Sequence, residues 1–126
     1  MSGFSFDSNI VIDALAGFEQ ARFEIRRGAS FGSRPWISRM VWIEVLSKGP
    51  QASLAKAEGF LSGFGIDEMD AEIAGRAAAL RRERPRLKSP DAIILASALV
   101  RGRVLVTRNT KDFPANMPGI RVPYLF

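Results

Sequence analysis

Short apolar runs alternate along the chain with longer segments in which apolar residues recur at helical spacing. Phe4 to Asp7 and then Ile10 to Ile12 have the pattern of a short buried strand that ends at an Asp-Ser-Asn turn and enters a helix. Similar runs predict further strands over residues 36–38, 66–69, 104–107 and 120–122, of which 66–69 is a brief edge strand. The helical spacing predicts helices over residues 14–27, 38–48, 52–61, 71–84 and 89–100.

Helix boundaries are indicated by capping residues and by glycine or proline. Candidate N-caps are Ser38, Asp70 and Ser89. Ser89 is followed by Pro90 at the first helical position and by Asp91 in the first turn, an order that favours a helix N-terminus. Gly28 is predicted to close the first helix, and Gly49-Pro50 is predicted to stop the second.

The alternation of strands and helices predicts an α/β fold built from right-handed βαβ units, with a mainly parallel sheet covered on both faces. The helix over residues 92–100 is apolar almost all round, so it should be central. A length of 126 residues suits a single domain spanning residues 1–126. No apolar run is long enough for a membrane span and no signal-peptide pattern is present, which favours a cytoplasmic protein.

Two missing residue types narrow the possible chemistry. The chain has no cysteine and no histidine, which excludes a thiol nucleophile, a Ser-His-Asp triad and an ordinary zinc site. Carboxylate, lysine and hydroxyl groups remain for catalysis. Clustered carboxylates favour hard cations with oxygen ligands, namely Mg²⁺ or Mn²⁺.

Acidic residues follow several of the predicted strands. Asp7 follows the first strand, Asp112 lies beyond the strand that ends near residue 107, and Asp91 stands at a helix N-terminus. Glu44 lies one to two turns into the helix after the second strand. Because the working site of an open α/β sheet lies beyond the carboxyl ends of its strands, we expect these four side chains to converge.

Each acid also has a structural interpretation. Asp7 could cap the following helix, Asp91 could complement a helix dipole, and Asp112 could serve a turn. Glu44 has apolar neighbours on both sides and is harder to explain as a solvated residue, although an arginine partner is possible. These separate interpretations leave out the repulsion between the acids. Two carboxylates 4 Å apart repel by roughly 4 kcal/mol at an effective dielectric of 20. A cluster of four therefore favours a divalent metal, and metal-dependent phosphodiester hydrolysis follows from it.

Positive charge outside this cluster is consistent with a nucleic-acid substrate. The formal net charge is +5, and the densest basic run, residues 81–88, covers the end of the fourth predicted helix and the segment before the fifth. Its candidate RNA contacts are Arg81, Arg82, Arg84, Arg86 and Lys88. The alternative is a solvated helix end in which cations offset the C-terminal dipole, and both interpretations can hold together.

Four segments, in order, resemble the motifs of the PIN-domain ribonucleases, and the closest likeness is to the VapC-type toxins of bacterial toxin–antitoxin pairs. These segments are Phe6-Asp7-Ser8-Asn9-Ile10, Ile43-Glu44-Val45-Leu46, Ser89-Pro90-Asp91-Ala92-Ile93-Ile94-Leu95-Ala96 and Val106-Thr107-Arg108-Asn109-Thr110-Lys111-Asp112-Phe113. Each motif alone is weak, but four in the right order within one domain are strong. The resemblance covers nearly the whole chain.

The resemblance implies a three-layer, Rossmann-like PIN domain that cuts RNA endonucleolytically with Mg²⁺ or Mn²⁺. It implies that four acids are catalytic, namely Asp7, Glu44, Asp91 and Asp112. Of these, Asp7, Asp91 and Asp112 are the implied metal ligands. Whether Asn109 or Asp112 completes the metal site stays open. Thr107 and Asn9 are expected to support the ligands. The family further implies a homodimer and inhibition by a cognate antitoxin.

Three other classes of protein are alternatives to this resemblance. Phosphoaspartate phosphatases use Asp-x-Asp after the first strand, whereas this chain has Asn9 at the second position. A receiver domain needs a phosphoacceptor Asp and a late Lys, for which no convincing pair exists. The remaining alternative is a catalytically silent PIN-like domain that binds RNA or serves as a scaffold. Degenerate relatives lose acids, whereas this chain keeps four.

Overall fold

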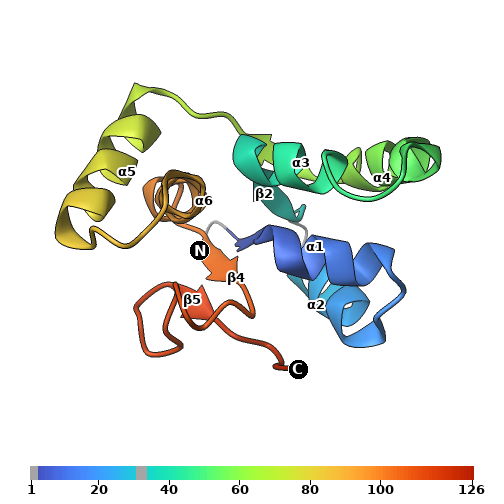
Figure 1. The fold of residues 1–126 in the computed structure, drawn as a ribbon. Helices are drawn as coiled ribbons and strands as arrows, with labels where there is room; N and C mark the ends of the chain where they lie inside the picture. The colour runs from blue at the N-terminus through green and yellow to red at the C-terminus, as the bar shows by residue number, and fades with distance from the viewer. Residues whose placement is uncertain (1–2, 31–33) are drawn as a thin grey trace.

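A computed structural model describes residues 3–30 and 34–126 and contains a five-stranded sheet (Figure 1). The strands are β1 (Phe4–Phe6), β2 (Trp36–Ser38), β3 (Gly65–Asp67), β4 (Val104–Val106) and β5 (Ile120–Arg121). Their order in the sheet is β3-β2-β1-β4-β5, and every neighbouring pair is parallel. The predicted parallel α/β fold is therefore confirmed, and the brief strand predicted at residues 66–69 lies at a sheet edge.

Helices lie on both sides of the sheet (Figure 1). They are α1 (Ser8–Leu15), α2 (Glu19–Ala29), α3 (Arg39–Leu46), α4 (Leu54–Leu61), α5 (Ala71–Glu83) and α6 (Ser89–Val100), and a 3₁₀ turn, η1 (Gln51–Ser53), precedes α4. Helices α5 and α6 pack together on one side, while α1 and α2 pack together on the other. No helix of the described residues is long and apolar enough to cross a membrane.

The prediction of one helix over residues 14–27 is wrong, because the segment belongs to two helices. Helix α1 begins directly after Asp7 and ends at Leu15, and α2 starts at Glu19. Gly17 between them has φ of +93°, a conformation that glycine adopts without steric cost and that a helix cannot include. The glycine breaks the helix there, and the change of direction brings α2 back against α1.

Two predicted helix boundaries also differ from the structure. Gly28 does not close a helix but lies inside α2, where a Cβ atom would come within 3.0 Å of the Phe6 ring. This glycine lets the helix approach the sheet closely. The N-cap of α6 is Lys88 rather than Ser89, and Ser89 is the first helical residue. The predicted caps Ser38 and Asp70 are confirmed, since each side chain accepts a backbone N–H of the first turn.

The centre of the molecule is the helix α6, as its apolar sequence predicts. It contacts α5, α3 and the strands β2 and β4. Ala92, Ile94, Leu95 and Ala96 are fully buried, and the neighbouring strand residues Phe6 and Leu105 are buried with them. Because the body of α6 is fixed by this packing, its N-terminal turn is held rigidly at the sheet edge.

The strand order creates a natural crevice at the centre of the sheet. From β1 the chain continues to β2 on one side, whereas β4 pairs with β1 on the other side. At such a reversal of strand order a crevice opens outside the carboxyl ends of the strands. Asp7 follows β1 directly and Thr107 follows β4 directly, so both residues lie at this crevice.

Candidate active site

Asp7 is the most deeply placed acid at the crevice. It is the N-cap of α1 and only 3% exposed. Its Oδ1 accepts the Ser8 N–H at 2.8 Å, and its Oδ2 accepts the Thr107 hydroxyl at 2.7 Å and the Asn9 amide at 3.2 Å. Burial raises the pKa of Asp7, the three hydrogen bonds oppose that rise, and the charge of Glu44 adds to it. The three hydrogen bonds therefore fix the orientation of the Asp7 carboxylate, although burial makes its negative charge unfavourable.

Asp91 shows that the four predicted acids are electrostatically close to one another. It lies half-buried in the first turn of α6. Its pKa is raised from 3.8 to about 6, first by burial and then by the charges of Asp112, Asp7 and Glu44. Lys88, one turn earlier, lowers the same pKa. The charges of Asp112, Asp7 and Glu44 therefore all act on Asp91, and we refer to Asp7, Glu44, Asp91 and Asp112 as the carboxylate cluster. Their joint role in a metal site stays a prediction.

Asp112 and Asn109 form a small turn beside the cluster. The Asn109 amide donates to Asp112 Oδ2 at 3.0 Å, and the Asp112 N–H donates to Asn109 Oδ1 at 3.3 Å. The Asn109 N–H also donates to the Thr107 hydroxyl at 3.0 Å, which links this turn to the hydrogen bonds of Asp7. Asn109 therefore orients the Asp112 carboxylate through Oδ2, and Oδ1 of Asp112 takes no part in that hydrogen bond.

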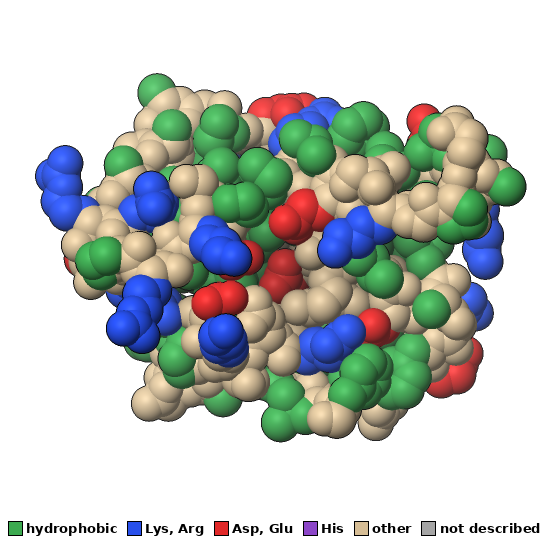
Figure 2. Space-filling model, in the orientation of Figure 1, with side chains coloured by type: hydrophobic (Ala, Val, Ile, Leu, Met, Phe, Trp, Pro, Cys, Tyr) green, Lys and Arg blue, Asp and Glu red, His purple; other side chains and the backbone are tan. Residues whose placement is uncertain are grey.

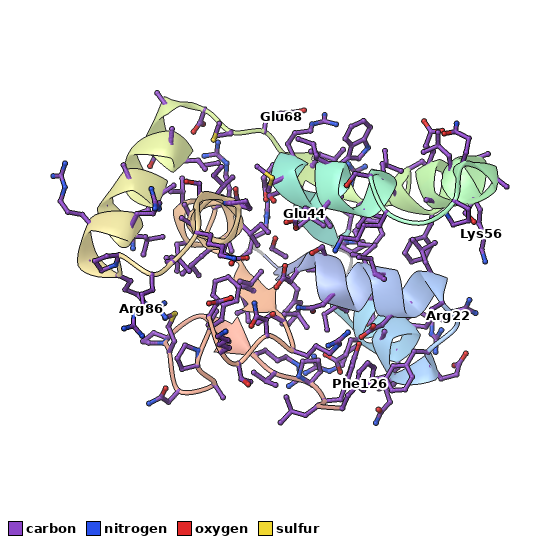
Figure 3. The ribbon with its side chains drawn as sticks, viewed as in Figure 1. Arg22, Glu44, Lys56, Glu68, Arg86 and Phe126 are labelled. Carbon is purple, nitrogen blue, oxygen red and sulfur yellow. The ribbon has the colours of Figure 1, made fainter. Side chains whose placement is uncertain are left out.

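Glu44 reaches the cluster from α3. The helix starts at the carboxyl end of β2, where the Ser38 hydroxyl accepts the Val41 N–H at 3.2 Å. Glu44 lies on the side of this helix that faces the middle of the molecule (Figure 3). The space-filling view shows acidic side chains gathered in a hollow at the centre of this face, with lysine and arginine side chains around it (Figure 2).

The cluster differs from Asp13, Glu24 and Asp67 because none of its acids forms a salt bridge among the described residues. Asp13, Glu24 and Asp67 are each less than 9% exposed, and each accepts two hydrogen bonds from one arginine. The salt bridges within residues 3–30 and 34–126 include none of the four cluster carboxylates. Buried charges are normally paired or bound to metal, so this cluster has the character of a cation site.

The donor set suits Mg²⁺ or Mn²⁺. All the available ligand atoms are oxygens, which hard divalent cations prefer. In the part of the chain that the structure describes, no three acidic side chains are close enough to enclose an ion on their own. Mg²⁺ usually keeps several water molecules and takes only one or two carboxylates, so a wider cluster such as this one fits its chemistry.

The predicted RNA contacts divide into two groups. Arg81 donates from Nε to the Leu87 carbonyl at 2.9 Å, and Arg84 donates from Nη2 to the Asp112 carbonyl at 2.7 Å. These two side chains therefore brace the segment between α5 and α6 and the turn that carries Asp112. Arg82, Arg86 and Lys88 are exposed. Their contact with RNA stays a prediction.

Arg108, Asp13 and Tyr124 are three residues near the cluster that the sequence analysis did not single out. Arg108 pairs with the buried Asp13, and the Tyr124 hydroxyl donates to the same carboxylate. Asp13 stands between Ile12 and Ala14 in an apolar stretch, which is the signal that drew attention to Glu44. Applied to every acid in an apolar run, that criterion would have found Asp13.

Comparisons with known proteins identify the family of this chain. The model of the PIN domain family matches residues 5–116. The chain is 29% identical over 120 residues to a tRNA(fMet)-specific endonuclease VapC of Shigella flexneri, covering 90% of this chain and 91% of the relative. It is 33% identical over 99 residues to the protein of the same name from Salmonella typhimurium, covering 71% and 74%. A solved toxin–antitoxin complex from Klebsiella pneumoniae matches with a TM-score of 0.85 and 38% identity, covering 97% of this chain and 98% of that one. The chain therefore belongs to the PIN domain family, and within that family it is of the VapC type.

Proposed function

We propose that this chain is an endoribonuclease that depends on Mg²⁺ or Mn²⁺ and acts as the toxin of a toxin–antitoxin pair. The observation that carries the proposal is the carboxylate cluster, in which the charges of Asp112, Asp7 and Glu44 raise the pKa of Asp91 while arginine neutralises the other buried acids. The names of the VapC relatives support endonucleolytic cleavage as the activity.

Asp7, Asp91 and Asp112 are the residues that would hold the metal ion. Because no three acidic side chains among the described residues are close enough to enclose an ion, one or two of them would bind it directly and the rest through water. A bound divalent cation would lower the pKa of water and stabilise negative charge on a phosphate. Thr107, Asn9 and the Ser8 N–H keep the Asp7 carboxylate in one orientation, and Asn109 does the same for Asp112. Glu44 supplies a further carboxylate from α3, whose charge acts on Asp7 and Asp91, and it would accept a proton from the attacking water.

The basic side chains around the cluster would hold the RNA backbone. Figure 2 shows lysine and arginine side chains at the rim of the acidic hollow. Lys88 lies close enough to Asp91 to lower its pKa, and Arg82 and Arg86 are exposed nearby in the chain. Such a rim attracts phosphates while the cluster supplies the reacting groups. Because two relatives are named for tRNA(fMet), transfer RNA is the substrate to test first.

A cognate antitoxin is the partner that we propose. The 38% identical structure is described as a toxin–antitoxin complex, and its similarity spans nearly the whole of both chains. A cationic side chain of such a partner, placed at the cluster, would relieve the repulsion between carboxylates and would exclude both metal and RNA. Homodimer formation stays a prediction from the family resemblance.

The proposal is tested by RNA cleavage with the purified chain, free of any partner. Transfer RNA and a mixed RNA pool are incubated with Mg²⁺ or Mn²⁺, with and without chelator, alongside the Asp7→Asn and Asp91→Asn variants. Glu72→Gln is the control, because Glu72 is an exposed acid in the first turn of α5, far from the cluster in sequence and on another element. We expect cleavage by the wild type and the control only, and only with metal.

Other outcomes would change the interpretation. Cleavage that persists in both cluster variants would mean that Asp7 and Asp91 are structural caps. No cleavage by a folded wild type that binds metal would favour the catalytically silent, RNA-binding alternative. The retention of all four acids at one crevice gives no support to that alternative.

A further inference from the structure

Arg108 follows Thr107 directly, yet its side chain pairs with Asp13 on α1 and not with the carboxylate cluster. Nε donates to Oδ2 of Asp13 at 2.7 Å, and Nη2 donates to Oδ1 at 3.1 Å. This bidentate geometry fixes both the position and the plane of the guanidinium. Asp13 is 7% exposed, and its hydrogen bonds raise the pKa of Arg108.

Tyr124 and Phe126, near the C-terminal end of the sequence, contact this ion pair. The Tyr124 hydroxyl donates to Asp13 Oδ2 at 2.7 Å, and burial raises the pKa of Tyr124, so the phenol keeps its proton. The guanidinium carbon of Arg108 lies 4.3 Å from the centre of the Phe126 ring. Phe18 packs edge-on against both Tyr124 and Phe126, with ring centres 5.0 Å apart in each case. The arginine is therefore held by an acid on one side and an aromatic ring on the other.

The backbone of Arg108 connects this packing to the site. Its N–H donates to Asn9 Oδ1 at 3.3 Å. The Nδ2 of the same Asn9 donates to Asp7 Oδ2 at 3.2 Å and to the Thr107 hydroxyl at 3.3 Å. Because the oxygen and nitrogen of an amide share one rigid plane, holding Oδ1 sets the direction in which Nδ2 donates. The position of the Arg108 N–H therefore sets the direction in which the Asn9 amide donates to Asp7.

We propose that Arg108 is a positioning residue for Asp7, and that Asp13, Tyr124 and Phe126 hold it in place. We call these four residues the Arg108 anchor. The inference rests on the proposed function, because Asp7 is one of the acids that would bind the metal ion. Partners that orient a metal ligand affect metal affinity and activity although they do not touch the ion.

A purely structural role for the Arg108 anchor makes a different prediction, and the chain offers a matched control. Glu24 on α2 is 6% exposed and accepts two hydrogen bonds from Arg121, at 2.8 and 3.0 Å. This pair has the same chemistry, burial and bidentate geometry as the Asp13–Arg108 pair. Among the described residues, the Arg121 side chain forms hydrogen bonds with Glu24 and with none of Asn9, Thr107 and Asp7. The Arg121 carbonyl accepts the Thr107 N–H at 3.0 Å, but that bond belongs to the pairing of β4 with β5, which does not depend on the Glu24 carboxylate. Loss of the Glu24–Arg121 pair should therefore affect stability alone.

The test compares Tyr124→Phe and Asp13→Asn with Glu24→Gln in the full chain. Mn²⁺ affinity is measured by calorimetry without RNA, kcat and KM are measured on the RNA that the wild type cleaves, and hydrogen exchange of the Arg108 N–H is followed by NMR. We expect Tyr124→Phe and Asp13→Asn to weaken Mn²⁺ binding and lower kcat by roughly ten- to a hundredfold, with KM unchanged. The Arg108 N–H should exchange faster in both, and Glu24→Gln should change none of these values.

Three results would overturn the inference. Normal Mn²⁺ affinity and kcat in folded Tyr124→Phe and Asp13→Asn would show that the anchor does not position Asp7. Equal losses in Glu24→Gln would show that the effect follows from stability alone. A wild type that binds no Mn²⁺ would remove both this inference and the proposed metal dependence. A wild type that binds Mn²⁺ but cleaves no RNA would contradict the proposed function only, and the Mn²⁺ affinities would still decide the role of the anchor.

Discussion

The buried and half-buried acids among the described residues include two groups, and only the first has arginine partners. Asp13, Glu24 and Asp67 each face one arginine in a bidentate pair, and the pairs connect elements that are distant in the sequence. The carboxylate cluster has hydrogen bonds and neighbouring like charges, but takes part in no salt bridge among the described residues. The first group neutralises its charge within the fold, and the second group keeps it.

The difference between these two groups of acids shows that burial and charge, considered together, can indicate a functional site. A buried acid with an arginine partner tells the reader little about chemistry, because structural pairs are common. A buried acid whose nearest charges are other acids is costly, and proteins retain such groups mainly at functional sites. Among the described residues, the cluster is therefore distinguished by having no salt bridge, and the acids paired with arginine provide an internal standard for comparison.

The largest expected effect comes from breaking a paired acid. Arg103 donates to both oxygens of Asp67 at 2.9 Å, and it stacks on Trp36 with its guanidinium carbon 3.7 Å from the ring centre. Removing one partner of a buried ion pair costs about 3–5 kcal/mol, and we expect Asp67→Ala to lower the free energy of unfolding by that amount in urea denaturation. Asp67→Leu together with Arg103→Met should recover most of the loss. A loss of stability similar to that of a surface substitution would contradict the structural role assigned to the pair.

A substitution within the carboxylate cluster is expected to raise the free energy of unfolding rather than lower it. Asp91→Asn removes a charge that three other acids repel, so it should stabilise the metal-free protein at pH 7 by about 0.5–2 kcal/mol while abolishing cleavage. Urea denaturation of the two proteins in chelator measures the difference. Destabilisation by this substitution would indicate that Asp91 is a helix-capping residue whose charge is compensated.

The pH dependence of this difference follows from the raised pKa of Asp91. The folded state holds the proton with a pKa of about 6, whereas the ordinary value is 3.8. Between these two values the folded state binds more protons than the unfolded state, so stability falls as pH rises. Below pH 3.8 both states are protonated and the penalty is absent, and above pH 6 it is complete. The stability gap between Asp91→Asn and the wild type should therefore widen from pH 4 to pH 6 and stay constant above.

Much of the fold follows from periodicity that the sequence carries locally. The strands at residues 36–38 and 104–106 and the caps Ser38 and Asp70 were predictable, because apolar alternation and capping are properties of adjacent residues. The break at Gly17 and the buried Gly28 were missed for a physical reason. A glycine can end a helix or allow a close approach to another element, and only the position of Phe6 distinguishes these uses.

The cluster was predictable to a greater extent than the contacts that orient it. Asp7, Asp91 and Asp112 stand at element ends that topology brings to one edge, so strand order alone places them together. The Arg108 anchor joins residues 95 and 111 positions apart in the chain, and no local pattern encodes such a pairing. What sequence reasoning lacked was the three-dimensional partner of each charged residue.

Addition of metal should change the free energy of unfolding by less than Asp67→Ala does. An ion that binds only the folded state stabilises it by about 1.4 kcal/mol when its free concentration is ten times its dissociation constant. We expect Mg²⁺ or Mn²⁺ to raise the Tm of the wild type, and Asp7→Asn to lose that response. Glu24→Gln should keep the response, because its carboxylate belongs to the paired group. An equal shift in Asp7→Asn would place the bound ion elsewhere on the protein.

The smallest effect is expected at the surface, where pairing exists without burial. Glu68 accepts two hydrogen bonds from Arg39, in the same bidentate arrangement as the buried pairs, but its side chain is 65% exposed. Water and salt screen such a pair, so Glu68→Gln should leave the unfolding midpoint in urea almost unchanged, and added salt should abolish any difference. A loss as large as that of Asp67→Ala would mean that bidentate geometry alone, and not burial, makes the arginine partners essential. The expected result instead identifies burial as the property that makes an arginine partner necessary, and among the described residues Asp7 is set apart as a buried acid that forms no salt bridge.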